Sequence, residues 1–75
     1  MDELVRAKRA ADILNDEVLL EAFSVVEDTQ VGVFKYPNSS SEDIMEAHRM
    51  VRALGALRDQ LQAFVDAGKV AARRK

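Results

Sequence analysis

Apolar residues recur at helical spacing along almost the whole chain, with polar residues in the positions between them. Three runs share this period. Their apolar members are Leu4, Ala7, Ala11 and Leu14 in the first run, Leu19, Ala22, Phe23 and Val26 in the second, and Ala47, Met50, Leu54, Leu57, Leu61 and Phe64 in the third. The pattern predicts helices over about residues 3–14, 17–35 and 40–67, followed by a basic tail at residues 69–75.

The boundary between the first two helices falls on the consecutive polar residues Asn15, Asp16 and Glu17. Asn and Asp are favoured at helix starts because their side chains accept hydrogen bonds from free backbone amides. Acidic residues there also suit the helix dipole. We therefore predict a break near Asn15. One continuous helix is the alternative, because none of the three residues forbids it.

The segment KYPNSSSED, residues 35–43, contains the single proline and interrupts the helical pattern. Pro37 disfavours helical angles at the preceding residue, so the second helix should end near Tyr36. Ser39 followed by Glu42 fits a capping box, in which each side chain bonds the other residue's backbone amide; Ser40 with Asp43 is the alternative frame. A connection this short joins antiparallel neighbours. The segment is therefore interpreted as a bend between helices.

The predicted fold is all-α: an antiparallel helical hairpin with a shorter N-terminal helix, giving two or three helices. The third helix is longer than the second, so its C-terminal part needs cover from the first helix or from another subunit. Gly55 and Ala56 would suit a close helix crossing. Gly68 is predicted to end the third helix, because glycine is favoured just after a helix C-terminus. One more helical turn over residues 69–75 is the alternative.

Composition indicates a single small domain whose hydrophobic core alone gives little stability. The chain has 75 residues, no cysteine and one histidine, so neither a disulfide nor a metal bound by several histidines can stabilise it. Its apolar content of 48% is more than two or three helices can hide, so we expect a homo-oligomer. The residues predicted to mediate association are Leu4, Leu14, Leu57, Leu61 and Phe64.

Charge is divided unevenly along the chain. Residues 1–46 hold four basic and eleven acidic side chains, whereas residues 47–75 hold seven basic and two acidic ones. This asymmetry favours antiparallel pairing of the helices, within one chain or between chains. The alternative is that the basic half contacts nucleic acid or an acidic protein. The candidate nucleic-acid contacts are Arg49, Arg52, Lys69, Arg73, Arg74 and Lys75.

No residue set predicts catalysis, a cofactor or a metal site. His48 is the single histidine, and Glu46 is two residues away, so the two side chains face different sides of a helix. Glycine-rich phosphate loops and spaced metal ligands are absent from the sequence. No apolar run approaches the roughly 20 residues of a membrane span. We therefore expect a cytoplasmic protein that is not an enzyme.

Two stretches carry a resemblance to a known group of proteins: ADILNDEVLLEAF at residues 11–23 and MVRALGALRDQLQAFVDAGKVA at residues 50–71. They resemble small, mostly uncharacterised helical proteins of tailed bacteriophages and prophages. The resemblance implies a phage accessory or structural protein of a head, packaging or tail module, in the host cytoplasm or the virion. Its partners would be other phage proteins or a host protein.

The function favoured by these observations is non-catalytic protein–protein association, during phage assembly or in a prophage. A small nucleic-acid-associated packaging or regulatory factor is the competing hypothesis, based on the basic C-terminal half. Inhibition of a host protein is a third.

Overall fold

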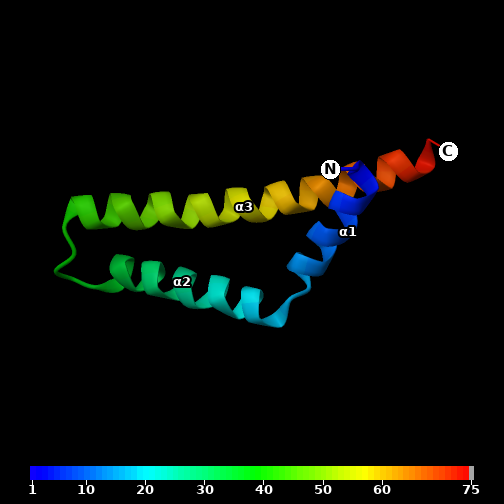
Figure 1. Cartoon of the computed structure of the whole chain (residues 1–75). Helices are drawn as coiled ribbons and strands as arrows, with labels where there is room; N and C mark the ends of the chain where they lie inside the picture. Colours follow the sequence, from blue (N-terminus) through cyan, green and yellow to red (C-terminus); the bar gives the residue numbers. More distant parts are fainter. Residues whose placement is uncertain (75) are drawn as a thin grey trace.

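The computed structural model describes residues 1–74, which form three α-helices and no strand: α1 (Glu3–Leu14), α2 (Glu17–Lys35) and α3 (Ser41–Arg73). α2 and the N-terminal half of α3 form an antiparallel hairpin, and α1 crosses the C-terminal half of α3 (Figure 1). The start of α1 and the C-terminal end of α3 lie toward the end of the molecule opposite the α2–α3 loop (Figure 1). The predicted all-α class is thus confirmed.

The break between α1 and α2 falls on the two residues where the sequence places it. Asn15 follows the last residue of α1, and its side-chain amide donates to the carbonyl of Ala11 at 2.9 Å. Asp16 caps α2, because its carboxylate accepts from the amide of Leu19 at 3.0 Å. With the two caps adjacent, the chain changes direction sharply, and α1 turns away from α2 onto α3.

The α2–α3 loop uses the alternative capping frame. The Ser40 hydroxyl accepts from the Asp43 amide at 3.0 Å, and the Asp43 carboxylate accepts from the Ser40 amide at 3.2 Å. The predicted pairing of Ser39 with Glu42 is therefore wrong by one residue. The Ser39 amide instead donates to the Tyr36 carbonyl at 3.2 Å, so Ser39 belongs to the turn around the proline. Ser40 is the first residue after that turn, and it caps the helix.

Gly68 does not end α3, which continues to Arg73, so the predicted end at residue 67 is wrong. Gly68 keeps helical backbone angles and is buried beneath α1. A methyl group on Gly68 would overlap the Cβ of Ala7 and lie 3.8 Å from the carbonyl oxygen of Glu3. The close crossing expected at Gly55 is therefore at Gly68, since a Cβ at Gly55 meets nothing within 4 Å.

The hydrophobic core of this fold is small. Within residues 1–74, the buried apolar side chains are those of Ala10, Phe23 and Ala47. The molecule measures 57 × 22 × 17 Å and has a radius of gyration of 16.4 Å. A compact chain of this length would have a radius of gyration of about 11 Å. The helices thus form an elongated arrangement in which most apolar side chains keep one side in solvent.

Candidate functional site

One surface of the molecule carries apolar side chains from all three helices, and we call it the apolar face. It consists of three adjoining shallow grooves that share residues. Ile13 lines both the α1–α2 and the α1–α3 grooves, and Leu19 and Ala22 line both the α1–α2 and the α2–α3 grooves. The members of the apolar face are Ile13, Val18, Leu19, Ala22, Val26, Leu54, Leu57, Leu61 and Phe64.

Several side chains of the apolar face are strongly exposed. Val18 is 76% exposed and Leu57 is 52% exposed. Two further side chains extend the surface at helical spacing: Val25, three residues after Ala22, and Met50, four residues before Leu54. Single exposed apolar residues are ordinary on protein surfaces, whereas a contiguous apolar surface from several helices is typical of an interaction site.

The crossing of α1 over α3 covers the end of the apolar face. The Arg6 guanidinium lies over the ring of Phe64, with its carbon 4.4 Å from the ring centroid. Beside it, Ala7 packs against Gly68. Four of the five residues predicted to mediate association, Leu4, Leu14, Leu61 and Phe64, are only half-buried here. Leu57, the fifth, is the one that remains exposed.

Of the nine members of the apolar face, only Leu57, Leu61 and Phe64 were among the predicted association residues. The members that were not predicted are Ile13, Val18, Leu19, Ala22, Val26 and Leu54. The five predicted residues all come from α1 and α3, so the prediction left the apolar stripe of α2 to the hairpin. The signal that could have found them is the width of that stripe. Apolar residues of α2 extend around much of the helix, beyond the side that Phe23 buries against α3.

A single basic side chain bridges the hairpin behind the apolar face. The Arg58 guanidinium lies over the Phe23 ring, 4.7 Å from its centroid, and one terminal nitrogen is 2.8 Å from the Glu27 carboxylate. About one third of each charged side chain is exposed (37% and 31%), so water screens the pair only in part. Arg58 of α3 thus contacts two residues of α2, Phe23 and Glu27.

Removing the charge of Arg58 should lower the stability of the hairpin. We expect Arg58→Met to reduce the free energy of unfolding by about 1 kcal/mol, because Met keeps the apolar contact with Phe23 but leaves Glu27 without its partner. Asp12→Asn, which breaks the exposed Lys8–Asp12 pair, should change it by less than about 0.5 kcal/mol. Urea unfolding followed by circular dichroism measures both. If Arg58→Met and Asp12→Asn lower the free energy of unfolding equally, the Arg58–Glu27 pair stabilises the protein no more than an ordinary surface ion pair.

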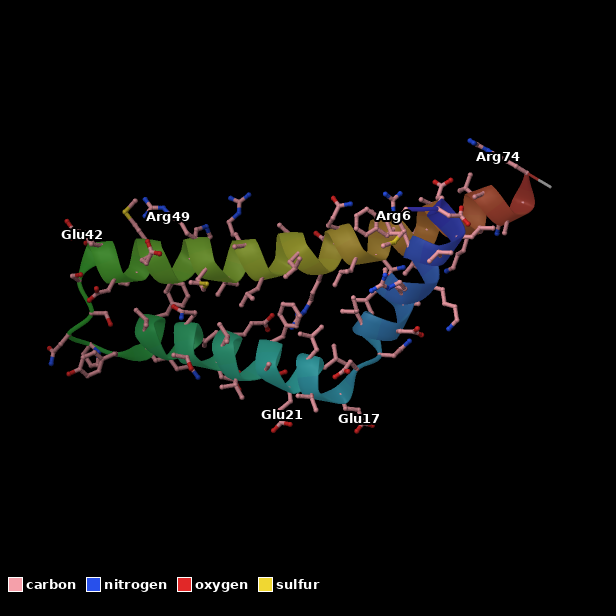
Figure 2. The ribbon with its side chains drawn as sticks, in the orientation of Figure 1. Arg6, Glu17, Glu21, Glu42, Arg49 and Arg74 are labelled. Carbon is pink, nitrogen blue, oxygen red and sulfur yellow. The ribbon has the colours of Figure 1, made fainter. Side chains whose placement is uncertain are left out.

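The candidate nucleic-acid contacts do not gather into one patch. Arg49 and Arg52 lie in the first half of α3, and Arg49 pairs with Glu46 at 3.4 Å. Lys69, Arg73 and Arg74 lie at the far end, about 26–33 Å from Arg52 along the helix axis. Figure 2 shows Arg49 and Arg74 toward opposite ends of α3. Lys75 lies outside the described residues.

The remaining chemistry of the described residues is sparse. His48 is exposed and lines a shallow groove with Phe34, Ile44, Met45 and Arg49, none of which is a nucleophile. Residues 1–74 contain no cluster of three or more His, Cys, Asp or Glu side chains that could bind a metal ion. None of the helices described here combines the length and the apolar character that crossing a bilayer requires.

Comparison with known proteins gives no relative. No protein-family model, no curated protein and no solved structure matches this chain. The resemblance to phage proteins therefore stays a prediction, and the apolar face is the feature from which function is inferred.

Proposed function

We propose that this chain is a non-catalytic protein that acts by helix-mediated association with another protein through its apolar face. The observation that supports the proposal is the contiguous apolar surface formed by all three helices, with Val18 and Leu57 more than half exposed. Following the resemblance described above, we place this activity in a phage or prophage, in a head, packaging or tail module.

The physical basis of the proposal is the free energy available at this surface. Fully burying a leucine or valine side chain contributes about 1.5–3 kcal/mol relative to exposing it. The core of a chain of this size rarely supplies more than about 3–5 kcal/mol. A partner that covers a few of these side chains therefore changes the stability of the protein by an amount comparable with its folding free energy.

The test is a pair of aspartate substitutions on α3. Leu57→Asp should weaken association by about tenfold or more, because it removes an apolar contact and would bury a charge. Val70→Asp is the matched control, since Val70 is 49% exposed on the same helix but does not line the apolar face. Sedimentation and capture of binding proteins from a bacterial lysate are the two measurements.

Both variants should keep the helical circular-dichroism signal of the parent chain, because both positions are at the surface. Loss of association in Leu57→Asp alone supports the proposal. If neither measurement distinguishes the two variants, the apolar face is not the working surface.

A further inference from the structure

We propose that α1 is a hinged cover that regulates the apolar face, and that the chain associates best when α1 straightens into one continuous helix with α2. We term this the straight form, and the form described above the bent form. The inference rests on the proposed function and adds to it how the surface is regulated. Three observations carry it: the contacts of α1, the helical phase of its apolar residues and the backbone of the break.

α1 is held in place mainly by α3. It crosses the C-terminal half of α3 and barely touches α2, although it adjoins α2 in the sequence (Figure 1). Its contacts cover one end of the apolar face, because Arg6 lies on the Phe64 ring and Ala7 packs on Gly68. Leu61 also lines the groove between the two helices. Movement of α1 away from α3 would therefore uncover that end without disturbing the hairpin.

The apolar side of α1 continues in phase onto α2. Residues three or four positions apart share one side of a straight helix, and such a series runs through the break. Its members, which we call the long stripe, are Leu4, Ala7, Ala11, Leu14, Val18, Ala22 and Val25. The members in α1 are half-buried, whereas Val18 and Val25 are 76% and 58% exposed. These two valines are the exposed remainder of a series whose first half packs on α3.

The long stripe does not face α3 in the straight form. Phe23 marks the side of α2 that lies against α3, because its ring is buried there beside Arg58. With 3.6 residues per turn, Val18 points about 140° and Val25 about 160° away from Phe23. A straightened α1 shares the orientation of these valines, so its apolar side turns away from α3. The bend is therefore what brings α1 onto its own α3, and straightening frees both surfaces for another protein.

The break depends mainly on one backbone angle. ψ of Asp16 is 114°, whereas ψ in an α-helix is about −42°. The bend is held by two caps, since the Asn15 side chain donates to the Ala11 carbonyl and the Asp16 carboxylate accepts from the Leu19 amide. Neither Asn15 nor Asp16 is a proline or a glycine, so both residues can continue a helix. Rotation at Asp16, with a smaller adjustment at Asn15, converts the bent form into the straight form.

The straight form has less internal contact and more surface for a partner. It loses the packing of α1 on α3, so the bent form dominates in an isolated chain. A protein that covers the long stripe and the uncovered end of α3 binds the straight form better and shifts the equilibrium toward it. The apparent affinity is reduced in proportion to the fraction of straight chains. α1 therefore sets how readily the apolar face is used.

Substitutions at the break act on one form at a time. Glu17→Pro should lock the bend, because proline suits the first position of a helix but disrupts the interior of a continuous one. Asp16 already has the extended angles that a residue before proline adopts. Glu17→Ala is the matched control. Asn15→Ala combined with Asp16→Ala should favour the straight form, because it removes both caps and adds strong helix formers.

A distance between spin labels reports the form directly. The sequence has no cysteine, so Val5→Cys on α1 and Asp28→Cys on α2 provide two specific, exposed attachment sites. In the straight form these positions are about 35 Å apart, and in the bent form they are closer. Pulsed electron paramagnetic resonance should show mainly the short distance in the parent and Glu17→Pro chains. The double alanine variant should show several-fold more of the long distance. The same short distance in every variant would overturn the hinge.

Association shows whether this movement regulates the apolar face. We expect Glu17→Pro to weaken self-association in sedimentation, or capture of proteins from a bacterial lysate, several-fold relative to Glu17→Ala. The double alanine variant should strengthen it. Equal association of Glu17→Pro and Glu17→Ala would overturn the regulatory role. If association is then still lost in Leu57→Asp but not in Val70→Asp, the proposed function stands without the hinge. Association that is independent of Leu57 would contradict the proposed function itself.

Discussion

Replacing Gly68 by alanine is expected to destabilise the protein, although alanine is the better helix former by about 1 kcal/mol. The added methyl group would overlap the Cβ of Ala7 on α1, and the Glu3 carbonyl lies 3.8 Å from it. α1 must therefore move away from α3, and overpacking of this kind costs typically about 1–3 kcal/mol. We expect a net fall in the free energy of unfolding, measured by urea titration at 222 nm.

Gly55→Ala is the matched control for this prediction. Gly55 lies in the same helix, and a methyl group there meets nothing within 4 Å, so the substitution should stabilise the protein by up to about 1 kcal/mol. Adding Ala7→Gly to Gly68→Ala removes the overlapping atom from the other helix and should recover part of the loss. Such recovery would identify the crossing as the cause. Stabilisation by both alanine substitutions would show that α1 does not pack closely on α3.

Most helix ends could be predicted from the sequence because they depend on local chemistry. Asp2 and Asp16 cap the helices that follow them with their own side chains, and each bond spans only a few residues. Pro37 acts on the backbone of its immediate neighbour. Choosing between Ser39 and Ser40 was harder, because both have an acidic residue three positions on. The choice depends on which serine the turn itself uses.

The role of Gly68 could not be predicted in the same way. A glycine near the end of an apolar stripe has the same sequence signature whether it ends a helix or admits another backbone. Which of the two roles Gly68 has depends on Ala7, about sixty residues earlier in the chain, because Ala7 packs against it. It also depends on the angle between α1 and α2 at the break at Asn15 and Asp16. Local patterns carry no information about that angle, so both the length of α3 and the site of the crossing were missed.

The candidate site was predictable to a similar degree. Spacing alone identifies the stripe of α3 that includes Leu57, Leu61 and Phe64. It does not reveal that α1 partly covers Leu61 and Phe64, with Arg6 stacked on the Phe64 ring. Nor does it reveal that Val18 of α2 is left exposed beside Leu19. Which part of a wide apolar stripe stays open is decided by how the helices pack.

The second large effect is expected at Phe23, the one large side chain buried within residues 1–74, at 6% exposure. Phe23→Ala should reduce the free energy of unfolding by about 3–5 kcal/mol, because the ring fills the space between α2 and α3 and supports the Arg58 guanidinium. That loss equals about the whole stability expected of a chain of this size. We therefore expect the dilute variant to be largely unfolded, with most of its ellipticity at 222 nm lost.

Phe34→Ala is the matched control, because it removes the same ring from the same helix at a position that is 43% exposed. It should reduce the free energy of unfolding by about 1–2 kcal/mol and leave most helix intact. Because association stabilises the folded state, the helical signal of Phe23→Ala should rise with protein concentration if the apolar face binds a second copy. Equal losses in the two variants would contradict a hairpin held together around Phe23. A signal that is independent of concentration would count against coupling between folding and association.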